Sequence, residues 1–344
     1  MSKIYTMNLQ LFAATPNTQT TGTSTLSTEM KTYYSDYLID NALPKLVHDQ
    51  FGQKHPIPKN GGKTIEFRKY SPLPKLTTAL TEGVTPDGQS LTVTNLTATV
   101  AQYGGYVTLS DMLLLTAIDN NLVQATKLLG NQAGATLDTI TREVLNGGTN
   151  VIYSGGVTSR ANLLGGSTTA SENCYLTVDD IKLAVRALKN QNAERIGDSW
   201  VAIIHPDVSY DLTNDPAWQN VKDYDPKDWY EGEIGRIAGV RFVETTEAKI
   251  WANAGKDKST GTATASSRAV YSTLVLGDNA YGVTDIEGGG LEHIVKQLGS
   301  AGTADPINQR ATVGWKATKV AERLVEQFMV RIESTSTFNP QTNN

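Results

Sequence analysis

The chain has 344 residues, with 30 basic and 35 acidic side chains and a formal net charge of −5. This length allows about two domains with a substantial core, and the acidic balance disfavours sequence-specific binding of duplex DNA, which needs a basic surface. A single cysteine, Cys174, excludes an intramolecular disulfide and fits a reducing compartment. No apolar run reaches the roughly 18 residues of a membrane-spanning helix.

The N-terminal region reads as an arm. Residues 13–28 are rich in Thr, Ser, Pro and Asn and have few large apolar side chains, so they cannot bury themselves against a core of their own. Ser27 is a plausible helix N-cap, and apolar and aromatic side chains follow at helical spacing until Pro44. We expect residues 1–51 to form an N-terminal arm with one short helix.

Residues 52–108 predict an extended two-stranded loop. Side chains alternate between two faces from Thr64 to Tyr70 and again from Leu91 to Val107, and a change of phase near Asn95 suggests a β-bulge. The intervening stretch is rich in proline and glycine and poor in apolar side chains. An isolated hairpin is marginally stable in water, and long loops are usually functional or docked elsewhere. We therefore expect another surface to hold this hairpin.

Charge is distributed unevenly along the chain. The hairpin is locally basic, whereas residues 207–233 are strongly acidic. Opposite patches favour docking and register, and two copies of one chain can supply both halves. The candidate subunit-interface residues are Lys63, Arg68, Lys69, Lys75, Asp223, Asp225, Asp228 and Glu231. The alternative is that both patches are solvated surface.

One long helix is expected from Ser110 to Asn146. Its apolar residues recur in steps of three and four, Ser110 is an N-cap signal, and Asn146-Gly147 is a C-cap signal. A continuous helix of this length would be about 50 Å long, and its apolar face suggests a packing seam. The alternative is two helices broken at Gly130 or Gly134, because each glycine weakens a helix by about 1 kcal/mol.

The rest of the chain predicts a second, mixed domain. Residues 147–172 are rich in Gly and Ser and suggest a domain boundary. A helix is expected after Thr177, with Asp180 completing a capping box, and a short helix at Pro206. Alternating or continuous apolar runs predict strands at 200–204, 236–245, 269–276, 280–286, 311–320 and 327–334. The fold class is α+β.

Patterns that could support chemistry are weak. Gly61-Gly62-Lys63-Thr64 copies the end of a phosphate-binding loop, but Ile57 occupies the required glycine position and a strand follows instead of a helix. The four histidines have no metal-binding spacing, and no activated nucleophile pattern is present. The acidic residues 223–231 leave a weak cation site open. The sequence predicts no enzyme activity and no cofactor.

Several runs resemble the major capsid proteins of tailed bacteriophages. They are VHDQFGQKHPIPKNGGKTIEFRKY at 47–70, LTEGVTPDG at 80–88, YVTLSD at 106–111, HPDVSYDL at 205–212 and GEIGRIAGVRFVET at 232–245. The resemblance implies a fold with an N-terminal arm, an extended β-hairpin loop, a long spine helix in a peripheral domain, and an axial α/β domain. It implies an arm at 1–51, the extended loop at 52–108, the peripheral domain with the spine helix at 109–172 and the axial domain at 173–300. Residues 301–344 are then expected to add strands to the peripheral domain and to form the C-terminal tail.

The resemblance also implies a function. Such proteins assemble into hexamers and pentamers of an icosahedral head around double-stranded DNA, in the virion, after assembly in the host cytoplasm. Portal, scaffold or decoration proteins are the expected partners, with nonspecific proximity to DNA. Some related capsids crosslink a lysine to an asparagine, and Lys63, Lys69 and Lys75 lie in the corresponding loop without a marked partner. The alternative is another phage structural or adhesion protein, of a tail or a fibre.

Overall fold

A computed structural model describes residues 18–19, 47–71, 73–80, 82–85, 87–116, 121–222, 236–287, 289–300 and 305–344. The short helix expected after Ser27 lies outside these residues. Contacts divide the chain into two compact units. Unit 1 takes residues 1–43, 102–134 and 289–318, and unit 2 takes residues 44–101, 135–288 and 319–344. The functional division expected from the resemblance stays a prediction.

Unit 1 is built on β5 (Ala101–Ser110) and β15 (Arg310–Arg323), which are neighbours in one sheet. Strand β1 (Thr18–Gln19) pairs with β5 in parallel, and β14 (Glu292–Lys296) pairs with β15 antiparallel. The two long strands approach closely where both lack side chains. A Cβ on Gly104 would lie 2.6 Å from the Trp315 carbonyl oxygen, and one on Gly314 would lie 2.8 Å from Tyr106 Cβ. Glycine is therefore required at this crossing.

The segment expected to be one long helix contains α1 (Asp111–Thr116) and α2 (Asn121–Asn146). The Ser110 hydroxyl accepts a hydrogen bond from the Leu113 amide at 3.2 Å, which confirms the predicted N-cap. Helix α2 runs without a break through Gly130 and Gly134, so the two-helix alternative is wrong there. It is about 39 Å long. Residues 117–120 lie outside the described chain, and continuity between α1 and α2 stays a prediction.

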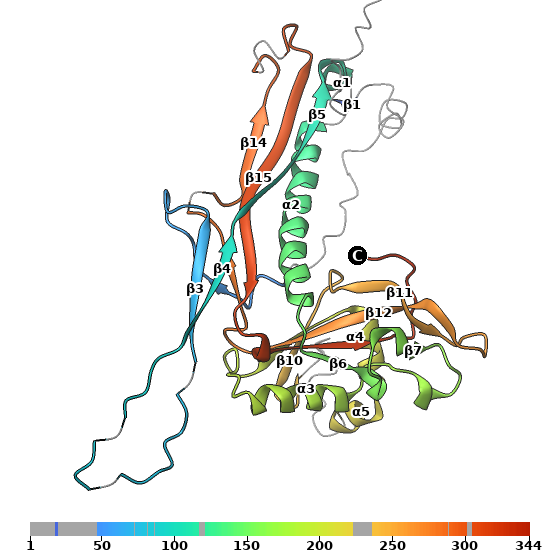
Figure 1. Cartoon of the computed structure of the whole chain (residues 1–344). Helices are drawn as coiled ribbons and strands as arrows, with labels where there is room; N and C mark the ends of the chain where they lie inside the picture. Colours follow the sequence, from blue (N-terminus) through green and yellow to red (C-terminus); the bar gives the residue numbers. More distant parts are fainter. Residues whose placement is uncertain are drawn as a thin grey trace, which may run out of the picture. The chain divides into compact units, whose positions relative to one another are not determined.

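In unit 1, the face of α2 that packs inward follows the expected pattern. Asn121, Ala125, Leu129 and Ala133 are buried at intervals of four residues. Next to this stripe, the Trp315 indole nitrogen donates to the Gln132 side-chain oxygen at 3.3 Å. Helix α2 therefore lies along β15, as Figure 1 shows.

Unit 2 contains an eight-stranded mixed sheet with the order β6-β16-β12-β8-β10-β9, to which β11 and β7 add through β12. The strands are β6 (Val151–Tyr153), β7 (Leu164–Gly165), β8 (Trp200–Ile204), β9 (Arg236–Ile237), β10 (Val240–Glu244), β11 (Ile250–Asp257), β12 (Thr264–Leu276) and β16 (Met329–Ser334). Strand β8 is parallel to β10 and antiparallel to β12. The sequence predicts β8, β10, β12 and β16 and misses β11.

Successive residues of these strands pack against opposite layers, as expected for a sheet covered on both faces. One face, with Ala202 and Ile204, meets α3 (Val178–Asn190), α4 (Pro206–Thr213) and α5 (Pro216–Lys222). The other face, with Ile203 and Leu276, meets Leu145 at the end of α2. The Thr177–Asp180 capping box at the start of α3 is confirmed.

The glycine-rich segment 147–172 belongs to unit 2, and the functional domain boundary expected at its end stays a prediction. Strand β6 pairs with β16, and β7 pairs with β11. Leu163 is fully buried, and the Arg160 guanidinium makes two hydrogen bonds of 2.7 Å to the buried Glu333 carboxylate. Partners distant in sequence therefore hold this segment in place despite its flexible composition.

The hairpin is shorter than expected. Strands β3 (Thr64–Tyr70) and β4 (Val93–Thr99) pair over seven residues in uninterrupted register, so the bulge expected near Asn95 is wrong. The break lies at Val100, whose amide bonds the Lys63 carbonyl at 2.8 Å. The chain then enters β5 and a different sheet. Strands β2 (Gln53–Lys54) and β13 (Tyr281–Thr284) pair in parallel below the hairpin base.

Candidate assembly surfaces

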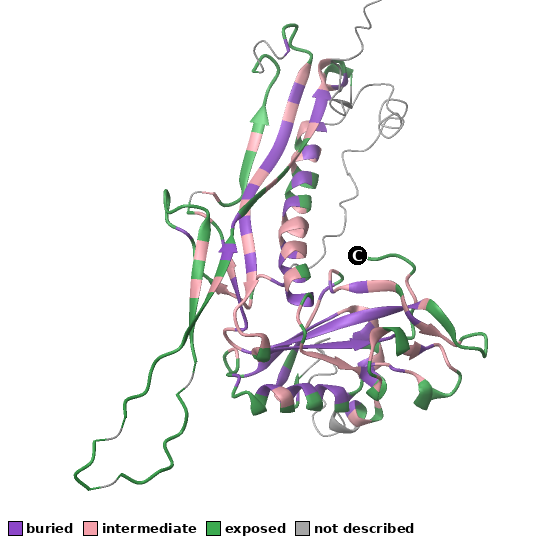
Figure 2. Cartoon of the chain, in the orientation of Figure 1, coloured by how far each residue is buried: buried purple, intermediate pink, exposed green. Residues whose placement is uncertain are grey.

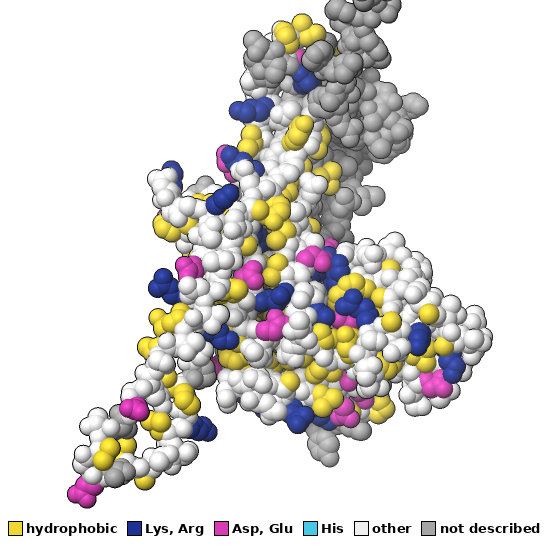
Figure 3. All heavy atoms as spheres, in the orientation of Figure 1, with side chains coloured by type: hydrophobic (Ala, Val, Ile, Leu, Met, Phe, Trp, Pro, Cys, Tyr) yellow, Lys and Arg dark blue, Asp and Glu magenta, His cyan; other side chains and the backbone are white. Residues whose placement is uncertain are grey.

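The tip of the hairpin exposes apolar side chains that no other described residues cover. Its last ladder bond joins the Ser71 amide to the Thr92 carbonyl at 3.0 Å, and the described residues beyond it form no strand. Leu76 and Leu80 are 81% and 76% exposed. The exposed large apolar residues of the hairpin are Tyr70, Leu73, Leu76, Leu80, Val84, Leu91 and Val93. Figures 2 and 3 show this tip as exposed and partly hydrophobic. Such a surface usually marks an interaction site.

The base of the hairpin, in contrast, is anchored in unit 2. The Phe67 ring lies edge-on to His55, with 6.0 Å between ring centroids, and approaches Gly282 of β13. Ala98 on the facing strand is buried, and Ile57 forms a parallel bridge with Ile286. The base of the hairpin is therefore fixed by contacts within unit 2, whereas the described residues of the tip are exposed.

The four predicted basic interface residues, Lys63, Arg68, Lys69 and Lys75, are all exposed. They do not form one patch. Arg68 pairs with Asn95 and Lys69 with Thr94 across the ladder, so their side chains leave opposite faces of the hairpin. Lys75 lies in the tip. None of the four makes an ion pair with the residues that the structure describes.

The four predicted acidic interface residues, Asp223, Asp225, Asp228 and Glu231, lie outside the described residues. Described acids just before them have internal roles. The Asp207 carboxylate accepts from the Tyr271 hydroxyl at 2.6 Å, Asp211 accepts from the Thr337 amide at 2.9 Å, and Asp215 accepts from the Val178 amide at 2.8 Å. These three acids therefore stabilise the fold, and docking of the hairpin onto the acidic segment stays a prediction.

Unit 1 carries a second set of exposed apolar side chains. Leu115 of α1 is 78% exposed and Ile307, just before β15, is 71% exposed. Among the described residues of this unit, the exposed large apolar side chains are Tyr106, Met112, Leu115, Val123, Leu128, Leu291, Val295, Leu298 and Ile307. The described residues thus include two sets of exposed apolar side chains, one on the hairpin and one on unit 1.

The C-terminal half of α2 buries polar side chains, although the sequence predicts a continuous apolar packing face for this helix. Asp138, Thr141 and Arg142 are all buried. Asp138 accepts from the His48 amide at 2.9 Å and lies 2.7 Å from His48 Nδ1. Arg142 donates to the Glu247 carbonyl at 2.9 Å. The prediction of a continuous apolar face is wrong here, because buried polar groups are satisfied by partners distant in sequence.

Three basic side chains bind the carbonyl groups near the end of α2. Lys319 donates to the Leu137 carbonyl at 2.8 Å, Arg323 to the Val144 carbonyl at 2.6 Å, and Arg331 to the Gly148 carbonyl at 3.0 Å. Of these, the Val144 carbonyl is one of the last four of the helix, which lack intrahelical donors and carry partial negative charge. Cations from β15 and β16 supply both the donors and the charge, so this end of α2 is fixed within unit 2.

Within the described residues, no three His, Cys, Asp or Glu side chains are grouped to hold a metal ion. Likewise, none of the described helices has the length and apolar character needed to cross a membrane.

An α+β chain with two uncovered apolar surfaces is the kind of subunit that functions in contact with other chains. Residues 49–297 match the family described as phage capsid protein. The chain belongs to this family. It is a structural major capsid protein, a component of the virion that associates with itself in a capsid lattice.

Solved capsid structures have the same fold. The capsid protein of cyanophage P-SCSP1u matches with a TM-score of 0.65 and 14% identity over 88% of this chain and 91% of that chain. The capsid protein of Ralstonia phage GP4 matches with a TM-score of 0.65 and 14% identity over 90% and 96%. The capsid asymmetric unit of cyanophage Pam1 matches with a TM-score of 0.64 and 15% identity over 90% of this chain and 97% of that chain. No curated protein matches the sequence. The α+β capsid fold expected from the sequence is confirmed.

Proposed function

We propose that this capsid protein forms hexamers and pentamers of an icosahedral head that encloses double-stranded DNA. The observation that carries the proposal is the outer part of the hairpin, where five large apolar side chains of the tip and two at the adjoining ends of β3 and β4 are exposed. A single chain gains nothing from this exposure, because burying such side chains is worth about 1.5–3 kcal/mol each. Neighbouring subunits recover this free energy when they cover the tip.

The physical basis is repetition of the same contact by rotational symmetry. The tip of one subunit and the apolar surface of unit 1 on another are two different surfaces, so their contact is heterologous. Heterologous contacts generate closed rings when the rotation closes. Stable interfaces bury about 1,600 Å² in total, and a loop that extends over a neighbour is an efficient way to reach that area. The same argument supports the division into arm, extended loop, peripheral domain and axial domain.

Removing the tip tests the proposal. Replacing Ser71–Ser90 with a short Gly/Ser linker should leave a soluble, folded subunit, because the described residues of this stretch add little to the core. It should abolish shells in electron micrographs. The control keeps the tip's length and replaces Leu76 and Leu80 by Ser, which should weaken assembly without abolishing folding. Intact shells from the deletion variant would refute the role of the tip.

The proposal extends to partners and place of assembly. A closed head that packages DNA needs a portal, and many heads need scaffold or decoration proteins, so these are the expected partners, with assembly in the host cytoplasm. A tail or fibre component is the alternative. It predicts open polymers, whereas the head protein predicts rings of five or six and closed shells.

A further inference from the structure

The exposed side of α3 carries a basic hollow that the assembly surfaces do not include. Lys182, Arg186 and Lys189 follow one another at helical intervals of four and three residues, and Arg195 lies in the loop after the helix. These four side chains, together with Val185, Asn190, Ala238 and Gly239, line a surface depression of about 490 Å³. This depression is called the α3 basic hollow below.

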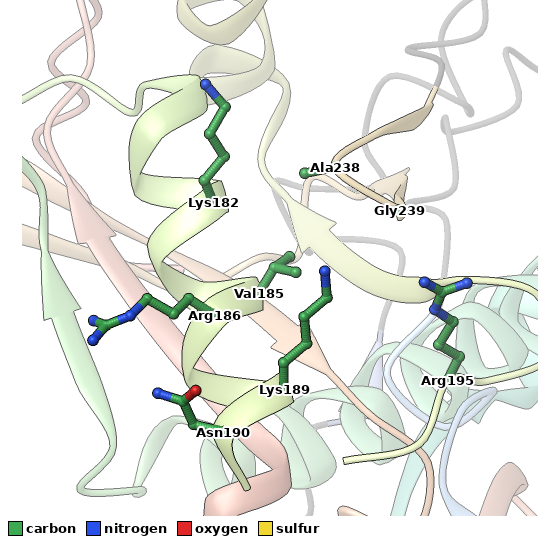
Figure 4. A pocket seen from close by; sticks show the side chains of 8 residues that line it. All are labelled: Lys182, Val185, Arg186, Lys189, Asn190, Arg195, Ala238 and Gly239. Carbon is green, nitrogen blue, oxygen red and sulfur yellow. The ribbon is translucent and has the colours of Figure 1, made fainter. Parts of the chain in front are cut away.

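The hollow is strongly positive in a chain that is acidic overall. Its lining contains four cations and no carboxylate. Lys182 is 2.9 Å from Asp179, in an exposed ion pair that contributes little. The other three cations make no ion pair with any described residue. In Figure 4, Lys189 and Arg195 flank the hollow beside the Ala238–Gly239 turn, and Arg186 points away from Lys189.

Two of these cations are positioned by a rigid aromatic ring. The Lys189 amine lies 5.6 Å and the Arg195 guanidinium 4.7 Å from the centroid of the Trp200 ring, within the range of cation–π attraction. Trp200 is only 3% exposed and belongs to the core under α3. Both cations therefore contact the same buried ring, and no carboxylate of the described residues neutralises either of them.

The ligand that best fits this arrangement is a chain of phosphates. Cations held together repel each other unless an anion lies between them, and guanidinium and ammonium donors match phosphate oxygens. From Lys182 to Lys189 the helix advances about 10 Å, which spans several phosphates of a strand at about 3.4 Å each. Contacts of this kind to phosphate oxygens position a protein on nucleic acid and carry no sequence information.

We propose that the α3 basic hollow binds the phosphate backbone of nucleic acid without sequence preference. That the natural ligand is packaged double-stranded DNA rests on the proposed head function. The binding itself is a property of the isolated subunit.

Binding of a fluorescent DNA duplex to the unassembled subunit, followed by anisotropy over a range of salt concentrations, tests the proposal. The variant is Lys182→Gln/Lys189→Gln/Arg195→Gln, and the charge-matched control is Lys63→Gln/Lys69→Gln/Lys75→Gln on the hairpin. Each lost phosphate contact lowers the slope of log K against log salt by about 0.9. For the α3 variant, the slope of log K against log salt should therefore become less steep by about 2.7, and the affinity at low salt should fall at least tenfold. The slope of the control should not change.

Three results would overturn the proposal. Equal losses in both triple variants would show that only net charge matters. Equally tight binding of polyglutamate would point to an acidic protein partner. Displacement of the duplex by millimolar inorganic phosphate at constant ionic strength would indicate a site for a single anion.

Folding and assembly are monitored separately. All substituted side chains are exposed, so circular dichroism should be unchanged, and Lys189→Arg, which keeps the charge, should keep binding. Shell formation by the α3 variant is examined by electron microscopy. Loss of DNA binding with normal shells supports the proposal, and failure of the wild-type chain to form shells bears on the head function alone.

Discussion

At the scale of single residues, His205 shows how burial creates pH dependence. It is the N-cap of α4, and its Nδ1 accepts a hydrogen bond from the Asp207 amide at 3.1 Å. Burial lowers the pKa of His205 below its ordinary value of 6.5, although the nearby carboxylates of Asp207 and Glu244 act in the opposite direction. The neutral form is therefore the one that the fold accommodates.

This shift predicts acid destabilisation. The folded state binds the His205 proton more weakly than the unfolded state does. The contribution of neutral His205 to the free energy of unfolding is therefore complete above about pH 6.5 and is lost as the pH falls below that value. The loss is at most about 1.4 kcal/mol per pH unit. The variant His205→Asn keeps an N-cap acceptor but cannot titrate. Urea unfolding of the unassembled subunit at pH 7.5 and 5.5 should show a smaller difference for the variant. An unchanged difference would assign the pH dependence to other groups.

Gly314 gives a second prediction at this scale. A Cβ there would meet Tyr106 Cβ at 2.8 Å and the Gly105 carbonyl oxygen at 2.9 Å, and backbone on both sides cannot move aside. Gly314→Ala should cost about 1–3 kcal/mol in the free energy of unfolding. Gly130→Ala is the control, because a Cβ there meets nothing within 4 Å and alanine favours a helix by about 1 kcal/mol. Similar effects of both substitutions would contradict the close strand crossing.

At the scale of elements, the end of α2 is fixed by charge. Lys319 is buried and donates to the Leu137 carbonyl and to the Asp49 carboxylate. Lys319→Met should lower the free energy of unfolding by about 1–3 kcal/mol, because it removes two hydrogen bonds made by a buried cation. Lys316→Met removes the exposed pair with Glu292 and should cost less than about 1 kcal/mol. Equal costs, measured by urea unfolding, would show that Lys319 acts only as a surface charge.

The elements also show what a sequence can predict. Helix α3 and strands β3 and β8 have local signals, namely a capping box, an alternating pattern and a continuous apolar run, and all three form as expected. Strand β11 has the sequence IWANAGKD, and Asn253 within it adopts a positive φ of 55°. Nothing local favours a strand there. It forms because β12 and β7 pair with its two edges.

The candidate surfaces were predictable to a similar extent. Their location on the hairpin follows from a proline- and glycine-rich stretch that cannot bury itself, and the exposed tip agrees with that reasoning. The basic residues of the hairpin do not share a face, because Arg68 and Lys69 are adjacent in a strand. The buried polar face of α2 could not be foreseen, since Asp138 and its partner His48 are 90 residues apart in sequence.

At the scale of the whole molecule, charge should tune assembly. Arg68→Glu/Lys69→Glu reverses two exposed cations of the hairpin. If the basic hairpin docks onto acidic groups of a neighbouring copy, the variant should assemble less well, most visibly at low salt, where screening is weakest. Light scattering during assembly at several salt concentrations measures this. An unchanged salt dependence would show that apolar contacts alone hold the hairpin.

The central claim is that this chain closes into a shell through repeated contacts between copies. Electron microscopy of the purified full-length chain, with sedimentation of the same sample, tests it most directly. The account predicts rings of five and six subunits and closed icosahedral particles. A stable monomer at high concentration, or open fibres, would contradict it.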